Sequence, residues 1–157
     1  MKNKIVKIVG LLIVMVLVSS LLAACGGKAT EAPAGGGEAG ETSGKPGPAV
    51  DLKGDATAGA VIFKNECKKC HGEEGKGGVE NPGATEPTVP GINPLDAEFV
   101  STDAKTFATN IDLFIEHGAT PEGDNPAKVM TAFGDEGKLT PQQIADVIAY
   151  VISLNQK

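Results

Sequence analysis

The sequence predicts a small all-α domain at residues 51–157, preceded by an export segment and a linker. Three stretches show the apolar spacing of amphipathic helices, and segments rich in glycine and proline separate them. No βαβ pattern is visible. A domain of 107 residues is long enough to form one small hydrophobic core.

The first predicted helix runs from about 56 to 70. Asp55 precedes it and is a candidate N-cap, because its carboxylate can accept hydrogen bonds from the free amides of the first turn. We expect Ala60, Val61 and Phe63 to lie on its inner side.

The second predicted helix covers 104–117, starts after a cap at Asp103 and ends at Gly118. Its apolar positions recur with the helical period. They are Phe107, Ile111, Phe114 and Ile115.

The third predicted helix runs from about 141 to 154. Thr140 and Gln143 have the spacing of a capping box, and Pro141 suits the first helical position. The apolar stripe comprises Ile144, Val147, Ile148, Val151 and Ile152.

Residues 1–24 have the features of a secretory signal: three lysines and then an apolar run from Ile8 to Leu22. The segment ends in Leu-Ala-Ala before Cys25, which resembles a bacterial lipobox. We therefore expect Cys25 to become the mature N-terminus and to carry lipid chains that anchor the protein to the membrane. The alternative is an uncleaved transmembrane anchor, for which this run is short.

Residues 25–50 are predicted to form a flexible linker from the lipid anchor, because they contain almost no large apolar side chains. The linker is either a plain spacer or a leash that lets the domain move between two membrane partners. Beyond Cys25, 11 lysines face 20 carboxylates, which gives a net charge of −9. Such a charge argues against binding to nucleic acid.

The pattern Cys67-Lys68-Lys69-Cys70-His71 is typical of covalent haem c attachment. Each thiol can add to one haem vinyl group, and His71 then becomes the proximal iron ligand. An export signal agrees with this interpretation, since bacteria attach haem c outside the cytoplasmic membrane. The alternatives are a thioredoxin-like redox motif, which needs a βαβ context, and a zinc site, which needs four ligands.

Met130 is the candidate for the distal iron ligand, because the other two methionines lie in the signal segment. A thioether ligand stabilises ferrous iron and raises the reduction potential. Two alternatives remain: His117, the only other histidine, and an open distal site. Met130 can also be an ordinary core methionine.

The domain resembles the small class I bacterial cytochromes c, which carry a single haem. The resemblance extends over residues 51–157 and depends on four motifs. They are Gly59-x-x-x-Phe63, Cys67-x-x-Cys70-His71-Gly72, Met130 before Ala132-Phe133-Gly134, and Ala149-Tyr150-Val151 in the last helix. The usual proline after the methionine is replaced by Thr131.

The resemblance implies three main helices wrapped around one covalent haem c. It also implies that Gly59 and Phe63 pack against Tyr150. A proline carbonyl is expected to accept a hydrogen bond from His71 Nδ1. Pro87 fits that role best, with Pro82 and Pro90 as alternatives.

The predicted function is that of an electron carrier rather than an enzyme. It would accept single electrons from a quinol-oxidising complex and donate them to a terminal oxidase or a photosynthetic reaction centre. The alternative is a haem enzyme or gas sensor with an open distal site. Four lysines near the haem motif form either a docking patch or a solvated face. They are Lys64, Lys68, Lys69 and Lys76.

Overall fold

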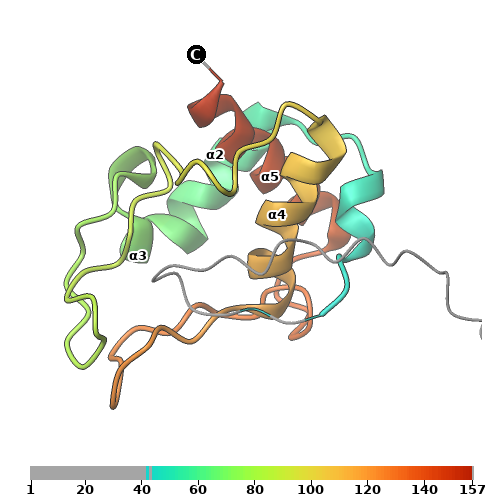
Figure 1. The fold of residues 1–157 in the computed structure, drawn as a ribbon. Helices are drawn as coiled ribbons and strands as arrows, with labels where there is room; N and C mark the ends of the chain where they lie inside the picture. Colours follow the sequence, from blue (N-terminus) through green and yellow to red (C-terminus); the bar gives the residue numbers. More distant parts are fainter. Residues whose placement is uncertain (1–41, 43, 157) are drawn as a thin grey trace, which may run out of the picture. The chain divides into compact units, whose positions relative to one another are not determined.

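The computed structural model describes residue 42 and residues 44–156 (Figure 1). The predicted signal segment (residues 1–24), Cys25 and the linker up to residue 41 lie outside the described residues. Among the described residues, no helix has the length and apolar character needed to cross a membrane.

The described chain is helical, which confirms the predicted all-α class. It has no strand in this part, and only two isolated bridges, Glu80 with Thr88 and Ala119 with Met130. The helical segments are η2 (Pro48–Asp51), α2 (Ala56–Ile62), the π-helical turn η3 (Phe63–Cys67), α3 (Lys68–His71), η4 (Glu73–Gly75), α4 (Ala104–His117) and α5 (Pro141–Asn155).

The first predicted helix is confirmed as the continuous series α2, η3 and α3. Asp55 caps it as expected, and its carboxylate accepts hydrogen bonds from the amides of Thr57 and Ala58 at 2.8 and 3.3 Å. Phe63 is buried, but the prediction that Val61 faces inward is wrong, because its side chain is 60% exposed. Gly59 and Phe63 define the buried face, and Val61 lies two residues, or about 200°, around the helix from either one.

The capping predictions for α4 and α5 are also confirmed. The Asp103 carboxylate accepts a hydrogen bond from the Thr106 amide at 2.8 Å. Thr140 and Gln143 form the reciprocal capping box. Helix α4 ends at Gly118, whose φ of 70° is unfavourable for residues with a side chain.

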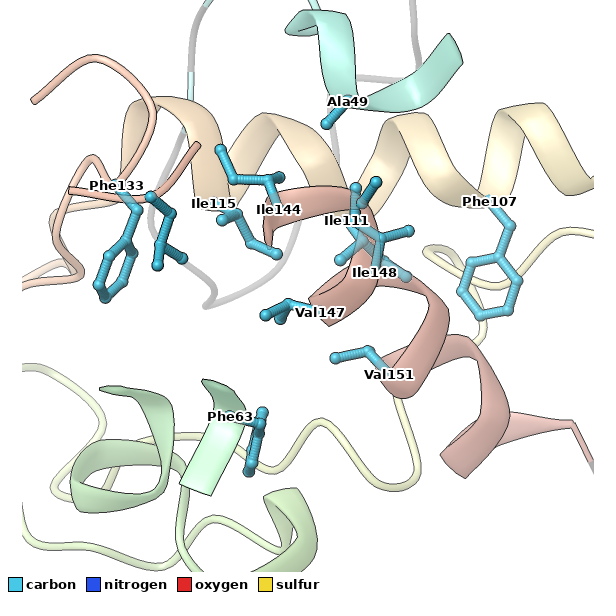
Figure 2. Packing of buried hydrophobic residues seen from close by; sticks show 12 residues of the cluster. Ala49, Phe63, Phe107, Ile111, Ile115, Phe133, Ile144, Val147, Ile148 and Val151 are labelled. Carbon is cyan, nitrogen blue, oxygen red and sulfur yellow. The ribbon is translucent and has the colours of Figure 1, made fainter. Parts of the chain in front are cut away.

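Helix α5 supplies five of the twelve buried residues of the hydrophobic core, more than any other element, and α4 packs against it (Figure 2). Helix α2 crosses α5 at Gly59, where an added Cβ would lie only 1.9 Å from the Asp146 carbonyl oxygen. This close approach brings the Phe63 and Tyr150 rings together, with centroids 5.3 Å apart. The Gly59, Phe63 and Tyr150 contact that the resemblance implied is therefore present, and it is a helix–helix contact.

The chain just before Asp51 is docked on the domain, although the sequence analysis assigned residues up to Val50 to a flexible linker. We call residue 42 and residues 44–52 the N-terminal strap. The buried Ala49 joins the core, and the Gly47 amide donates a 2.6 Å hydrogen bond to the buried Asp112 carboxylate on α4. The packed part of the chain therefore starts before Asp51.

Candidate functional site

A cavity of about 480 Å³ lies between the helices and the two long loops of the domain. Side chains from η3, α3, α4 and α5 line it, together with residues from the segments 81–99 and 119–133. Most of the lining is apolar, with aromatic and branched side chains from three helices. They are Phe63, Ile111, Phe114, Ile115, Val147 and Val151. Figure 2 shows Phe63 across from Val147 and Val151.

Both thiols of the Cys-x-x-Cys motif line this cavity. Cys67 ends the π-helical turn and Cys70 lies in α3, and neither forms a disulfide. Burial raises the pKa of Cys67 to about 12, and the nearby Glu66 carboxylate adds to this effect. The two sulfur atoms are thus held at the wall of one apolar cavity.

His71, at the end of α3, also lines the cavity. Its Nδ1 atom is buried and has no hydrogen-bond partner of regular geometry among the described residues. Burial lowers the pKa of His71, and the Pro90 backbone carbonyl opposes this effect only in part. The neutral imidazole that results is the form that binds metals.

Pro90, one of the two alternatives to Pro87, is the proline whose backbone carbonyl raises the pKa of the His71 ring. The Pro87 carbonyl instead accepts a hydrogen bond from the Asn81 amide at 2.8 Å, and that of Pro82 accepts one from Ala127 at 2.9 Å. Pro90 lines the cavity. We therefore propose Pro90 in place of Pro87 as the residue that orients the imidazole.

Met130 lines the same cavity, and it comes from the loop between α4 and α5. Its backbone is paired with that of Ala119, just beyond the end of α4. The Met130 amide donates to the Ala119 carbonyl at 2.9 Å, and the reverse bond measures 3.3 Å. The fold therefore brings Cys67, Cys70, His71 and Met130 to one cavity.

His117, the alternative distal ligand, does not line the cavity. Its Nδ1 lies 2.8 Å from the Asp135 carboxylate, and its Nε2 lies 2.8 Å from the Lys45 carbonyl. Both acceptors require an N–H donor, so this geometry suits the protonated imidazolium. The hydrogen bonds to Asp135 and Lys45 accordingly raise the pKa of His117. An imidazolium has no free nitrogen lone pair for iron.

The residues of the cavity fit a haem c. Two thiols stand ready for the vinyl groups, and the half-buried His71 ring, whose pKa is lowered by burial, offers a neutral imidazole to the iron. A neutral thioether and an apolar wall complete the site. When bound, the group supplies an iron that gains and loses one electron.

Among the lysines near the motif, Lys68 is paired with Glu73, and Lys76 lies 3.2 Å from Glu74. These exposed pairs reduce the positive charge that the predicted docking patch would offer.

Asn81 was not identified by the sequence analysis, although its side chain is buried at 2% exposure and lines the cavity. An asparagine before proline in a glycine-rich loop has the signature of an ordinary turn residue. Its long-range partners carry no sequence signal.

Comparison with known proteins gives the same indication as the cavity. The family model named Cytochrome c matches residues 56–155. The chain is also similar to the cbb3-type cytochrome c oxidase subunit CcoP of Azospirillum sp. (strain B510). The two are 37% identical over 115 residues, which is 68% of this chain and 33% of that protein.

A second relative is the cbb3-type cytochrome c oxidase subunit FixP of Sinorhizobium medicae (strain WSM419). It is 32% identical over 102 residues, which is 64% of this chain and 30% of the relative. The chain thus spans about a third of the length of these curated relatives. No solved structure shows a significant match.

The family match covers all the helices that line the cavity, from the start of α2 to the end of α5. It confirms the predicted cofactor, because c-type cytochromes carry their haem covalently on the Cys-x-x-Cys-His motif. The chain belongs to the cytochrome c family and is an electron-transfer protein with covalently bound haem c.

Proposed function

We propose that this protein is a membrane-tethered monohaem electron carrier that passes single electrons to a terminal oxidase. In this proposal Cys67 and Cys70 would hold the haem covalently, and His71 and Met130 would be the protein ligands of its iron. The observation that carries the proposal is the convergence of these four side chains on one apolar cavity. If both His71 and Met130 ligate the iron, no position would remain open to a substrate, which favours a carrier over an enzyme or gas sensor.

The chain's own residues fit this role. The π-helical turn and α3 hold the thiols and the imidazole, and the loop that carries Met130 is fixed to the end of α4. The apolar lining excludes water, and a thioether on one side raises the reduction potential. In this proposal the Pro90 carbonyl, which raises the pKa of His71, would orient the imidazole ring.

The relatives support a terminal oxidase as the electron acceptor. Their names describe subunits of cbb3-type cytochrome c oxidases. We propose that a quinol-oxidising complex is the donor and that lipid chains on Cys25 hold the protein at the extracytoplasmic face of the membrane. A photosynthetic reaction centre is the alternative acceptor.

The test is the substitution Met130→Ala in the secreted haem protein. We expect the low-spin visible spectrum of the wild type to be lost and the ferrous protein to bind carbon monoxide readily. Val129→Ala is a matched control, because Val129 is the preceding residue, is half exposed, and offers no iron ligand. An unchanged spectrum in Met130→Ala would eliminate Met130, and wild-type protein that already binds carbon monoxide readily would indicate an open distal site.

A further inference from the structure

Asn81 connects the two long loops that close the cavity. Its side-chain amide donates a 3.0 Å hydrogen bond to the Lys128 carbonyl, and its side-chain oxygen accepts a 2.6 Å bond from the Lys128 amide. The two residues are 47 positions apart, and the Asn81 side chain is buried. We call this pair of bonds the Asn81–Lys128 clamp.

Lys128, one of the two residues of the clamp, lies two positions before Met130 in the sequence. The backbone of Met130 itself is paired with that of Ala119. Three further backbone hydrogen bonds join the same loops. The Ala127 amide donates to the Pro82 carbonyl at 2.9 Å, the Thr85 amide to the Glu122 carbonyl at 2.8 Å, and the Asn125 amide to the Gly83 carbonyl at 3.4 Å. Of these contacts, the clamp is the one made by a buried side chain.

The clamp also reaches toward His71. The backbone amide of Asn81 donates to the Pro87 carbonyl, and the backbone amide of Val89 donates to the Val79 carbonyl at 2.8 Å. These bonds close a narrow loop that leads directly into Pro90, which acts on the His71 ring. The side-chain bonds of Asn81 and these backbone bonds thus link the segments that carry the two proposed iron ligands.

We propose that Asn81 is a positioning residue for Met130. It fixes the 127–130 segment relative to the His71 side of the cavity, so that the thioether remains within reach of the iron. This inference depends on the proposed role of Met130 as the distal ligand. Loss of the clamp leaves two partly buried backbone groups of Lys128 unpaired, and the segment relaxes to satisfy them.

The test compares Asn81→Ala with Asn155→Ala in the haem-loaded protein. Asn155 is a matched control, because its side chain also makes two hydrogen bonds to the backbone of a loop. Its oxygen accepts from the Leu95 amide, and its nitrogen donates to the Ile92 carbonyl. That loop does not carry Met130. The readouts are carbon monoxide affinity of the ferrous protein, hydrogen exchange of the Lys128 amide, and thermal unfolding.

We expect Asn81→Ala to raise carbon monoxide affinity about tenfold. The free energy of one or two hydrogen bonds is of the same order as the free energy that corresponds to a tenfold change in affinity. The Lys128 amide should exchange faster. Asn155→Ala should lose stability but keep the wild-type affinity. Equal affinities in the two variants would show that Asn81 is only a structural residue and would overturn the inference.

Asn81→Asp provides a second variant in case the alanine variant does not fold. Its carboxylate keeps an acceptor for the Lys128 amide but cannot donate to the Lys128 carbonyl. Protonation of this carboxylate at low pH restores the donor. The carbon monoxide affinity of Asn81→Asp should therefore approach that of the wild type, measured at the same pH, as the pH is lowered. An affinity that stays high at low pH would contradict the clamp.

Met130→Ala, measured in parallel, separates the two proposals. If Met130→Ala does not change carbon monoxide affinity, the ligand assignment fails. If Met130→Ala raises the affinity and Asn81→Ala does not, only the positioning role of Asn81 fails.

Discussion

Replacement of Gly59 by alanine should destabilise the domain, although alanine is the better helix former. In the structure, the new Cβ would lie 1.9 Å from the Asp146 carbonyl oxygen and 3.0 Å from the Tyr150 Cβ. A carbon–oxygen contact needs about 3.3 Å, so α2 and α5 would have to separate by about 1.4 Å. Backbone atoms cannot rotate out of the way as a side chain would.

Overpacking of this kind costs about 1–3 kcal/mol and sometimes more. The gain in helix propensity on replacing glycine by alanine is about 1 kcal/mol. Because the obstacle is backbone, we expect the upper range and a net loss of about 2 kcal/mol. For a domain of this size, that loss lowers Tm by about 8–16 °C.

The assay is thermal unfolding of the haem-loaded protein, followed by circular dichroism. Val61→Ala is the control, since Val61 lies on the same helix and is 60% exposed. It should change the stability by no more than about 0.5 kcal/mol. If Gly59→Ala is as stable as Val61→Ala, the close helix crossing does not limit this fold and the reasoning is refuted.

Two further predictions concern the strap and the anchor. The pKa of His117 is raised above its ordinary value of 6.5, so the stability it contributes is complete below that pH and is lost as the pH rises through the raised pKa. The free energy of unfolding, measured across this pH range, should fall in the wild type but not in His117→Gln. If the two proteins show the same dependence on pH, protonated His117 does not stabilise the fold. Cys25→Ser should release the protein from the membrane fraction if lipid chains on Cys25 anchor it, whereas retention there, seen by immunoblotting, would indicate the uncleaved segment as the anchor.

The helices could be predicted from the sequence because their signals are local. Asp103, Thr140 and Gln143 lie within a few residues of the amides they cap, and the apolar spacing of α4 and α5 needs no knowledge of distant contacts. The position of Val61 was predicted wrongly, because its apolar character was given more weight than its angle from Gly59.

The loops could not be predicted in the same way. The choice between Pro87 and Pro90 depends on backbone hydrogen bonds between residues about ten positions apart, such as Val89 to Val79. The contact between Asn81 and Lys128 spans 47 positions. Neither kind of contact leaves a period or a composition in the sequence.

The composition of the linker was also a poor guide to its end. Large apolar side chains are scarce there, but backbone groups and small residues dock instead. The Gly47 amide binds the Asp112 carboxylate, and the Lys45 carbonyl binds the His117 ring.

The docked strap limits how far the haem domain can lie from a lipid anchor at Cys25. If lipid holds Cys25, the chain from there to Thr42 has 17 links, and its contour cannot exceed about 60 Å. A chain free as far as Val50 would reach about 30 Å further. Under the proposed lipid anchor, the contacts of α4 with the strap would therefore confine the haem domain to a thinner layer above the bilayer, and the proposed electron donor and acceptor would have to present their docking sites within that layer.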